Sequence, residues 1–149
     1  MKQYDIGIDL GTTSIIIATE EQGVVFRQPT IGAVDTRTNS ILAVGDEALK
    51  MVGRAPAHID LVPPLRDGII QDHRMTNELI VRFVNQVCRS RIFKPRIAVC
   101  VPAAITGIEA DAVVESVMAA GARQVYLVDE PVAAALGAGL QIRQPHGCM

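Results

Sequence analysis

Two short apolar runs in the second half of the chain, joined by one helical segment, constrain the fold more than any other feature. The first run covers residues 97–101 (Ile-Ala-Val-Cys-Val) and the second covers residues 124–128 (Gln-Val-Tyr-Leu-Val). Such runs are typical of strands in a parallel sheet that is buried on both faces. Parallel strands need a crossover connection, which is usually a helix. The sequence therefore predicts an α/β fold with helices packed against a sheet.

The helices around these runs carry signals at their ends. Thr106 and Glu109 have the spacing of a capping box, and Gly121 suits the position just after a helix C-terminus. Thr76 is a candidate N-cap for an earlier helix with one apolar face. A last helix over residues 132–140 has almost no polar face, so we expect it to be covered on all sides.

The N-terminal part of the chain predicts an antiparallel meander. Apolar residues alternate with small or polar ones over residues 6–10, and a turn at residues 11–14 leads to a second apolar run at residues 15–18. A third strand is expected at residues 23–27. Strands with such short links pair antiparallel. The order β-β-β, insertion, α-β-α-β-α then predicts a mixed sheet with helices on its faces.

A proline-rich segment separates the meander from the first helix. Within it, residues 41–44 predict a strand and residues 46–53 a short helix. We interpret residues 32–67 as a small inserted subdomain, carried by one lobe that residues 1–31 and 68–149 form together.

Composition excludes several classes of protein. The chain has 149 residues, of which 49% are hydrophobic and 20% charged, so it can bury a core and is not disordered. A formal net charge of -2 gives no tendency to bind nucleic acid, and we expect no such partner. The three cysteines lack metal-ligand spacing, and no signal peptide or membrane-spanning run is present. These features predict a cytoplasmic protein.

The tip of the first hairpin has the composition of a phosphate site. Gly11 has no Cβ, so a bound anion can approach the backbone closely, and Thr12, Thr13 and Ser14 add hydroxyl groups. Asp9 offers a hard oxygen ligand for magnesium, directly or through water. The alternative is an ordinary tight hairpin with a solvated aspartate, and this stretch alone does not decide between the two.

A second acidic site follows the second apolar run. Ligands in open α/β sheets bind at the carboxyl ends of strands, which is where Asp129 and Glu130 lie. A carboxylate there can orient or deprotonate a water that attacks a phosphate. The simpler interpretation of this site alone is helix capping by Asp129, with Glu130 favoured by the helix dipole. Two acidic sites at strand ends together favour a shared cleft.

A basic segment surrounds one apolar pair. Ile92 and Phe93 lie within residues 89–96, which include no acidic residue. Such a pair can enter an anionic membrane surface. The composition alone favours the simpler interpretation, in which both side chains join the core.

Four stretches of the chain resemble known proteins. Residues 9–13 (Asp-Leu-Gly-Thr-Thr) resemble the first phosphate motif of the actin, heat-shock-70 and sugar-kinase superfamily. Three later stretches, taken in order, are similar to the MreB family of bacterial actins, which shape rod-like cells. They are residues 43–48 with 53–56, residues 64–70, which include Arg66-Asp67-Gly68, and residues 128–140.

The resemblance implies an actin-like ATPase (ribonuclease H-like) fold, with residues 32–67 as subdomain IB and the rest as subdomain IA. It implies ATP and Mg²⁺ as cofactors, self-association into filaments, other cell-shape proteins as partners, and work at the inner face of a bacterial membrane. Ile92 and Phe93 match the apolar pair that some family members insert into lipid.

The resemblance also assigns roles within the site. Asp9 belongs to the magnesium site, Gly11, Thr12 and Thr13 to the phosphate loop, and Glu130 is the carboxylate that positions the hydrolytic water. The family has Ala-Asn after its first threonine, whereas this chain has Thr-Ser.

The family chain continues into a second phosphate loop and an adenosine-binding half that this sequence does not contain. We therefore expect a truncated first lobe without a second lobe, with weak or absent ATP binding, and leave open whether it is an enzyme. The apolar last helix would then lose a covering neighbour. Two alternatives stay open: a sugar-kinase or heat-shock-70-like ATPase lobe, and a nucleotide-free module that binds filaments or membrane.

Overall fold

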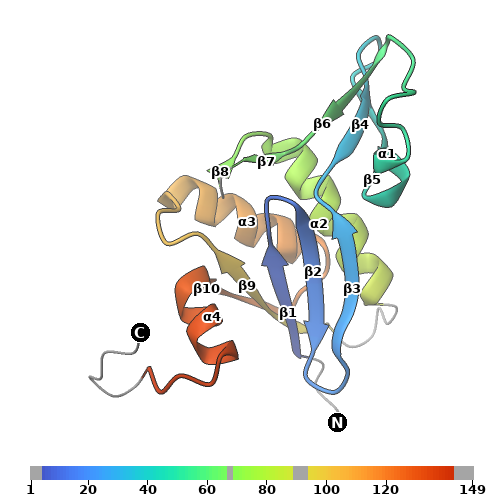
Figure 1. The fold of residues 1–149 in the computed structure, drawn as a ribbon. Helices are drawn as coiled ribbons and strands as arrows, with labels where there is room; N and C mark the ends of the chain where they lie inside the picture. Colours follow the sequence, from blue (N-terminus) through green and yellow to red (C-terminus); the bar gives the residue numbers. More distant parts are fainter. Residues whose placement is uncertain (1–4, 67–68, 89–93, 143–149) are drawn as a thin grey trace.

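The structure is a computed structural model that describes residues 5–66, 69–88 and 94–142. Its centre is a five-stranded sheet with the strand order β10-β9-β1-β2-β3 (Figure 1). The strands of this central sheet are β1 (Asp5–Leu10), β2 (Ser14–Thr19), β3 (Gly23–Pro29), β9 (Arg96–Val101) and β10 (Gln124–Asp129).

The predicted mixed sheet is confirmed. β1, β2 and β3 form an antiparallel meander, and β9 pairs parallel with both β1 and β10. The β1–β9 pair joins two distant parts of the chain. At its start, Asp5 lies opposite Arg96, and Arg96 Nε donates a hydrogen bond to Asp5 Oδ1 at 2.8 Å. This hydrogen bond lowers the pKa of Asp5.

Two helices, α2 (His73–Val87) and α3 (Gly107–Ala119), cover one face of the central sheet (Figure 1). Alternate residues of the strands point into this covered face, as the period of a strand requires. The main core is built from strand and helix side chains that include Ile6, Ile8, Leu10, Ile15, Ile17, Ile97, Val99, Val101, Leu79, Ile80, Phe83, Val84, Val113 and Val117.

The segment of the chain between β3 and α2 contains a second, smaller sheet. It has the order β5-β4-β6, from β4 (Gly32–Asp35), β5 (Ser40–Val44) and β6 (Ile59–Val62), with α1 (Asp46–Leu49) beside it. Its own apolar cluster is made of Ala33, Ala43 and Ala48. A two-stranded hairpin, β7 (Leu65–Arg66) and β8 (Ile69–Ile70), then leads to α2. The limits of the inserted subdomain stay a prediction.

The connection between the two sheets is fixed by side-chain and backbone bonds. Gln28 Nε2 donates to Asp46 Oδ2 at 2.9 Å, and the backbone N–H of Asp46 donates to Gln28 Oε1 at 2.8 Å. The N–H of Gly45 donates to the carbonyl of Ile31 at 2.9 Å. The exit of β5 is therefore bound to the segment that enters β4.

Two sequence predictions about helix ends are confirmed and two are wrong. Thr106 and Glu109 form the predicted capping box, and Gly121 has a φ of 104°. The predicted cap of α2 is wrong, because Asp72 is the N-cap, and its Oδ1 accepts the Met75 N–H at 2.9 Å. Thr76 lies inside the helix. The short helix expected at residues 46–53 ends at Leu49.

The last helix, α4 (Glu130–Gly137), follows β10 directly and contacts β9 and β10. It contains no buried residue, and Leu136 is 55% exposed. The prediction that this apolar helix is covered on all sides is therefore wrong for the described residues. Among those residues, no helix combines the length and the apolarity needed to span a bilayer.

Candidate functional site

The two predicted acidic sites lie at the same edge of the central sheet. Because β1, β9 and β10 run parallel, their carboxyl ends meet there. The strand register aligns Asp9, Cys100 and Val128 in one row across the three strands. Glu130 begins α4 where β10 ends. The fold thus brings Asp9 and Glu130 to strand ends separated by β9 alone.

Cys100 lies on β9, between the strand that carries Asp9 and the strand that leads to Glu130. It is half-buried, and burial raises its pKa, as do the negative charges of Asp9 and Glu130. Both carboxylates are therefore close enough to act on the same sulfur atom. The cysteine spacing in the sequence carried no signal of this arrangement, which follows from the strand register.

The hairpin tip lies at this edge and is tightly closed. A Cβ added at Gly11 would lie 2.7 Å from the backbone oxygen of Ser14 and 3.9 Å from Asp9 Oδ1. A side chain at position 11 therefore does not fit this turn, and the Asp9 carboxylate lies beside it. Thr12 and Thr13 are exposed. The tip thus presents backbone and hydroxyl groups to solvent next to a carboxylate.

A buried threonine that the sequence did not single out holds this hairpin. Thr30, which is 3% exposed, follows β3. Its backbone N–H donates to the Thr13 carbonyl at 3.0 Å, and its hydroxyl donates to the Gly11 carbonyl at 2.7 Å. The sequence offers one weak signal, a hydroxyl residue at the end of the strand that pairs with the second half of the hairpin.

The alternative role proposed for the second acidic site, helix capping with a dipole-favoured glutamate, is met only in part. Asp129 occupies the N-cap position of α4, but its side chain makes no capping hydrogen bond. Glu130 is half-buried in the first turn, where the helix dipole favours a carboxylate. Ile92 and Phe93, the predicted membrane contact, lie outside the described residues.

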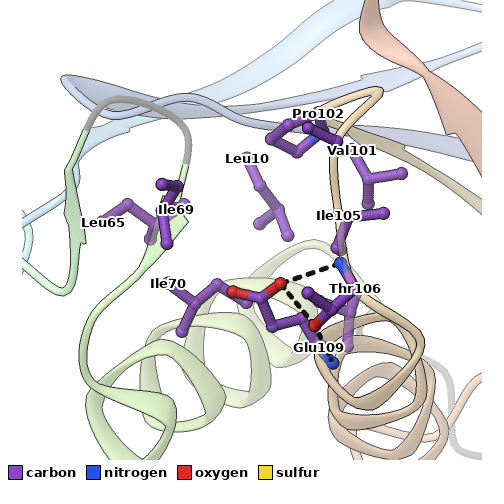
Figure 2. A pocket seen from close by; sticks show the side chains of 11 residues that line it. Leu10, Leu65, Ile69, Ile70, Val101, Pro102, Ile105, Thr106 and Glu109 are labelled. Carbon is purple, nitrogen blue, oxygen red and sulfur yellow. Dashed lines mark hydrogen bonds between the residues drawn. The ribbon is translucent and has the colours of Figure 1, made fainter.

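A cavity of about 280 Å³ lies on the opposite, covered face of the same sheet edge. Figure 2 shows Leu10 near Val101, with the Glu109 carboxylate at one side. This carboxylate accepts from the Thr106 N–H at 2.9 Å and from the Thr106 hydroxyl at 2.6 Å, and these bonds lower its pKa. Since Glu109 serves the capping box and the other walls are mostly apolar, this cavity is not the phosphate site.

Metal ligands are sparse at the candidate site. Within the described ranges, no group of three or more His, Cys, Asp or Glu side chains can hold a metal ion. Mg²⁺ needs fewer protein ligands than that, because it keeps several waters and is usually bound through one or two carboxylates together with substrate phosphates. An exposed Asp9 beside a turn of backbone and hydroxyl groups fits this mode of binding.

Comparisons with known proteins agree with this arrangement. The family described as "MreB/Mbl protein" matches residues 3–149. The cell shape-determining protein Mbl of Bacillus subtilis is 42% identical over 146 residues, which are 97% of this chain and 44% of the relative. The cell shape-determining protein MreB of Escherichia coli is 39% identical, over 100% of this chain and 45% of the relative.

Solved structures show the same likeness. MreB5 of Spiroplasma citri bound to ADP superposes with a TM-score of 0.83 at 33% identity, covering 98% of this chain and 44% of that one. A MamK double helical filament gives a TM-score of 0.76 at 18% identity, which shows the fold alone. The chain spans less than half the length of these relatives. On these matches and on its actin-like fold, the chain belongs to the MreB/Mbl family of cell shape-determining proteins.

Proposed function

We propose that this chain is the nucleotide-binding first lobe of an actin-like filament protein that determines cell shape. The observation that carries the proposal is the shared sheet edge, where Asp9 and the turn at Gly11 lie on one side of β9 and Glu130 follows the strand on its other side. Structures of the similar MreB5 are bound to ADP and to AMPPNP, which supports an adenine nucleotide as the ligand.

Each group at the edge has a distinct role in this proposal. The hairpin tip binds phosphate oxygens through backbone N–H groups and hydroxyls. Asp9 would hold Mg²⁺ through water, and the ion would supply positive charge next to the phosphates. Glu130 orients the water that attacks the terminal phosphate. These roles fit the residues but rest on the family resemblance for their assignment.

We propose that the isolated chain binds nucleotide weakly. It supplies one set of phosphate ligands, and α4 beside that set has no buried residue. The relatives have more than half of their length outside the match, and we infer that this part supplies the second wall of the nucleotide cleft.

The test uses the chain and a chimaera that joins it to the unmatched part of Bacillus subtilis Mbl. Calorimetric titration measures binding of MgAMPPNP, and phosphate release measures ATP turnover. We expect Asp9→Asn to weaken Mg²⁺-dependent binding by roughly tenfold or more, since it removes a charged ligand. We expect Glu130→Gln to bind normally and to lose about 100-fold or more in turnover.

Asp129→Asn is the matched control, because it changes the neighbouring carboxylate on the same helix end. It should leave both binding and turnover unchanged. If the Asp129 and Glu130 variants lost turnover equally, the assignment of Glu130 as the carboxylate that orients the water would be wrong. A chimaera that does not bind MgAMPPNP would favour a nucleotide-free interaction module.

We further propose that the protein self-associates into filaments and attaches to an anionic membrane surface through Ile92 and Phe93. The family resemblance supports both the assembly and the membrane contact, and the fold of this chain is shared with a MamK double helical filament. Vesicles with acidic lipids should co-sediment the chain, and the double variant Ile92→Ser, Phe93→Ser should lose this binding. Equal co-sedimentation of both proteins would rule out the apolar pair as the contact.

A further inference from the structure

We propose that Thr30 is a positioning residue for the phosphate hairpin and that its hydroxyl group increases the affinity of the hairpin for phosphate. The inference rests on the proposed function, since it explains how the hairpin tip is held in the shape that binds phosphate. No part of the family resemblance points to this residue. Its evidence is a pair of hydrogen bonds from one buried residue to both sides of the turn.

The two bonds hold different peptide groups. The Thr30 hydroxyl donates to the carbonyl of Gly11 at 2.7 Å, and the Thr30 backbone N–H donates to the carbonyl of Thr13 at 3.0 Å. A hydrogen bond of 2.7 Å has the ideal length for an O–H donor. With 3% of its surface exposed, Thr30 is shielded from water that would compete for these acceptors.

Fixing a carbonyl also fixes the N–H group on the same peptide plane. In a trans peptide, the C=O of one residue and the N–H of the next point in opposite directions. The carbonyl of Gly11 shares its plane with the N–H of Thr12. Because the Thr30 hydroxyl holds that carbonyl, it aims the Thr12 N–H away from the buried side of the turn. An oriented N–H is the group that an anion at this tip needs.

The hydroxyl and the backbone of Thr30 can be separated experimentally. Any residue at position 30 except proline retains the N–H that bonds Thr13, whereas the bond to Gly11 needs a side-chain donor such as the hydroxyl of Thr30. Thr30→Val has nearly the same shape and lacks the hydroxyl, and Thr30→Ser keeps it. Comparison of these two variants therefore separates the effect of the hydroxyl on the Gly11–Thr12 peptide from the effect of side-chain packing in the β3–β4 connection.

Thr76 provides a matched control. It is also 3% exposed, and its hydroxyl also donates to a backbone carbonyl, that of Asp72, at 2.8 Å. It lies in α2 and does not bond to the hairpin. Thr76→Val therefore removes an equivalent hydrogen bond of a buried hydroxyl group and should cause a similar loss of stability. It does so without changing the turn.

Two measurements on the 149-residue chain test the inference. The ¹³C resonance of the Gly11 carbonyl, recorded without ligand, reports the hydrogen bond directly. It should shift in Thr30→Val and stay in place in Thr30→Ser and Thr76→Val. Calorimetric titration with MgADP should give an affinity about tenfold lower in Thr30→Val, which corresponds to one lost hydrogen bond. Thr30→Ser and Thr76→Val should bind as the wild type does.

Failure of this inference and failure of the proposed function look different. If the wild type binds MgADP and Thr30→Val binds it equally well, the role of Thr30 is overturned and the nucleotide site stands. An unmoved Gly11 resonance in Thr30→Val overturns the inference with no reference to nucleotide. A wild-type chain without affinity for MgADP, even at millimolar concentration, counts against nucleotide binding by this lobe, and the affinity claim falls with it.

Discussion

Replacement of Phe83 by alanine is expected to lower the free energy of unfolding by about 3–5 kcal/mol. Phe83 lies in α2, is 1% exposed, and its ring centroid is 5.0 Å from that of Phe26. The truncation removes a large buried side chain, leaves a cavity in the main core, and breaks a tilted aromatic pair. The chain has three phenylalanines and no tryptophan, so few large side chains are available to refill the space. Urea unfolding followed by circular dichroism measures the effect.

Two variants separate burial from the aromatic pair. Phe26→Ala breaks the same pair at a half-buried strand position, so it should cost about half as much as Phe83→Ala or less. Phe83→Leu keeps most of the buried volume and should cost about 1.5 kcal/mol or less. If Phe26→Ala destabilised the chain as much as Phe83→Ala, the claim that the burial of Phe83 dominates its contribution to stability would be wrong.

Replacement of Gly45 by alanine is expected to lower the free energy of unfolding by about 3 kcal/mol from two causes. Gly45 has a φ of 64° and a ψ of -135°, a combination that is essentially restricted to glycine and costs other residues about 1–3 kcal/mol. An added Cβ would also lie 2.4 Å from Gln28 Oε1 and 3.0 Å from the tip of Phe83. Relief requires Gln28 to move, which breaks its paired hydrogen bonds with Asp46. Thermal and urea unfolding of the variant measure the loss.

Gly53→Ala is the matched control, because Gly53 has a φ of 74° and an added Cβ there meets nothing within 4 Å. Gly53→Ala should lower the free energy of unfolding only through the cost of a positive φ for alanine, which is about 1–2 kcal/mol. The difference between the two variants combines the crowding at the connection between the sheets with the cost of the unusual ψ of Gly45. Gln28→Ala in the Gly45→Ala background should recover part of the loss. Equal losses in the two glycine variants would show that the connection tolerates a side chain.

The sequence predicted those parts of the fold whose signals are local. The apolar runs at β9 and β10 and the alternation in β1 depend only on neighbouring residues, and each forms the expected strand. The capping box of α3 is equally local, because its two residues bond each other. The acidic residues Asp9 and Glu130 were found from their places at strand ends, and the strand pairing brings them to one edge.

What the sequence could not predict depends on partners distant in the chain. The neighbours of Cys100 follow from the parallel register of three strands, and the bonds of Thr30 follow from the closure of β3 onto the hairpin. The central strand β4 and the edge strand β6 of the small sheet carry too little local signal to be predicted, because each has only four residues. The cap of α2 was placed at Thr76 because a hydroxyl just before apolar residues has the same local signature as a true cap.

The β1–β9 pair sets the order in which this chain can fold during synthesis. Asp5 and Arg96 are 91 residues apart, so β1 has no partner on that side until β9 has left the ribosome. At translation rates of about 5–20 residues per second, this delay lasts roughly 5–20 s. During that interval the meander of β1, β2 and β3 presents β1 as an open edge with an apolar face. The nascent protein is thus most exposed to pairing with other chains before its own second half exists.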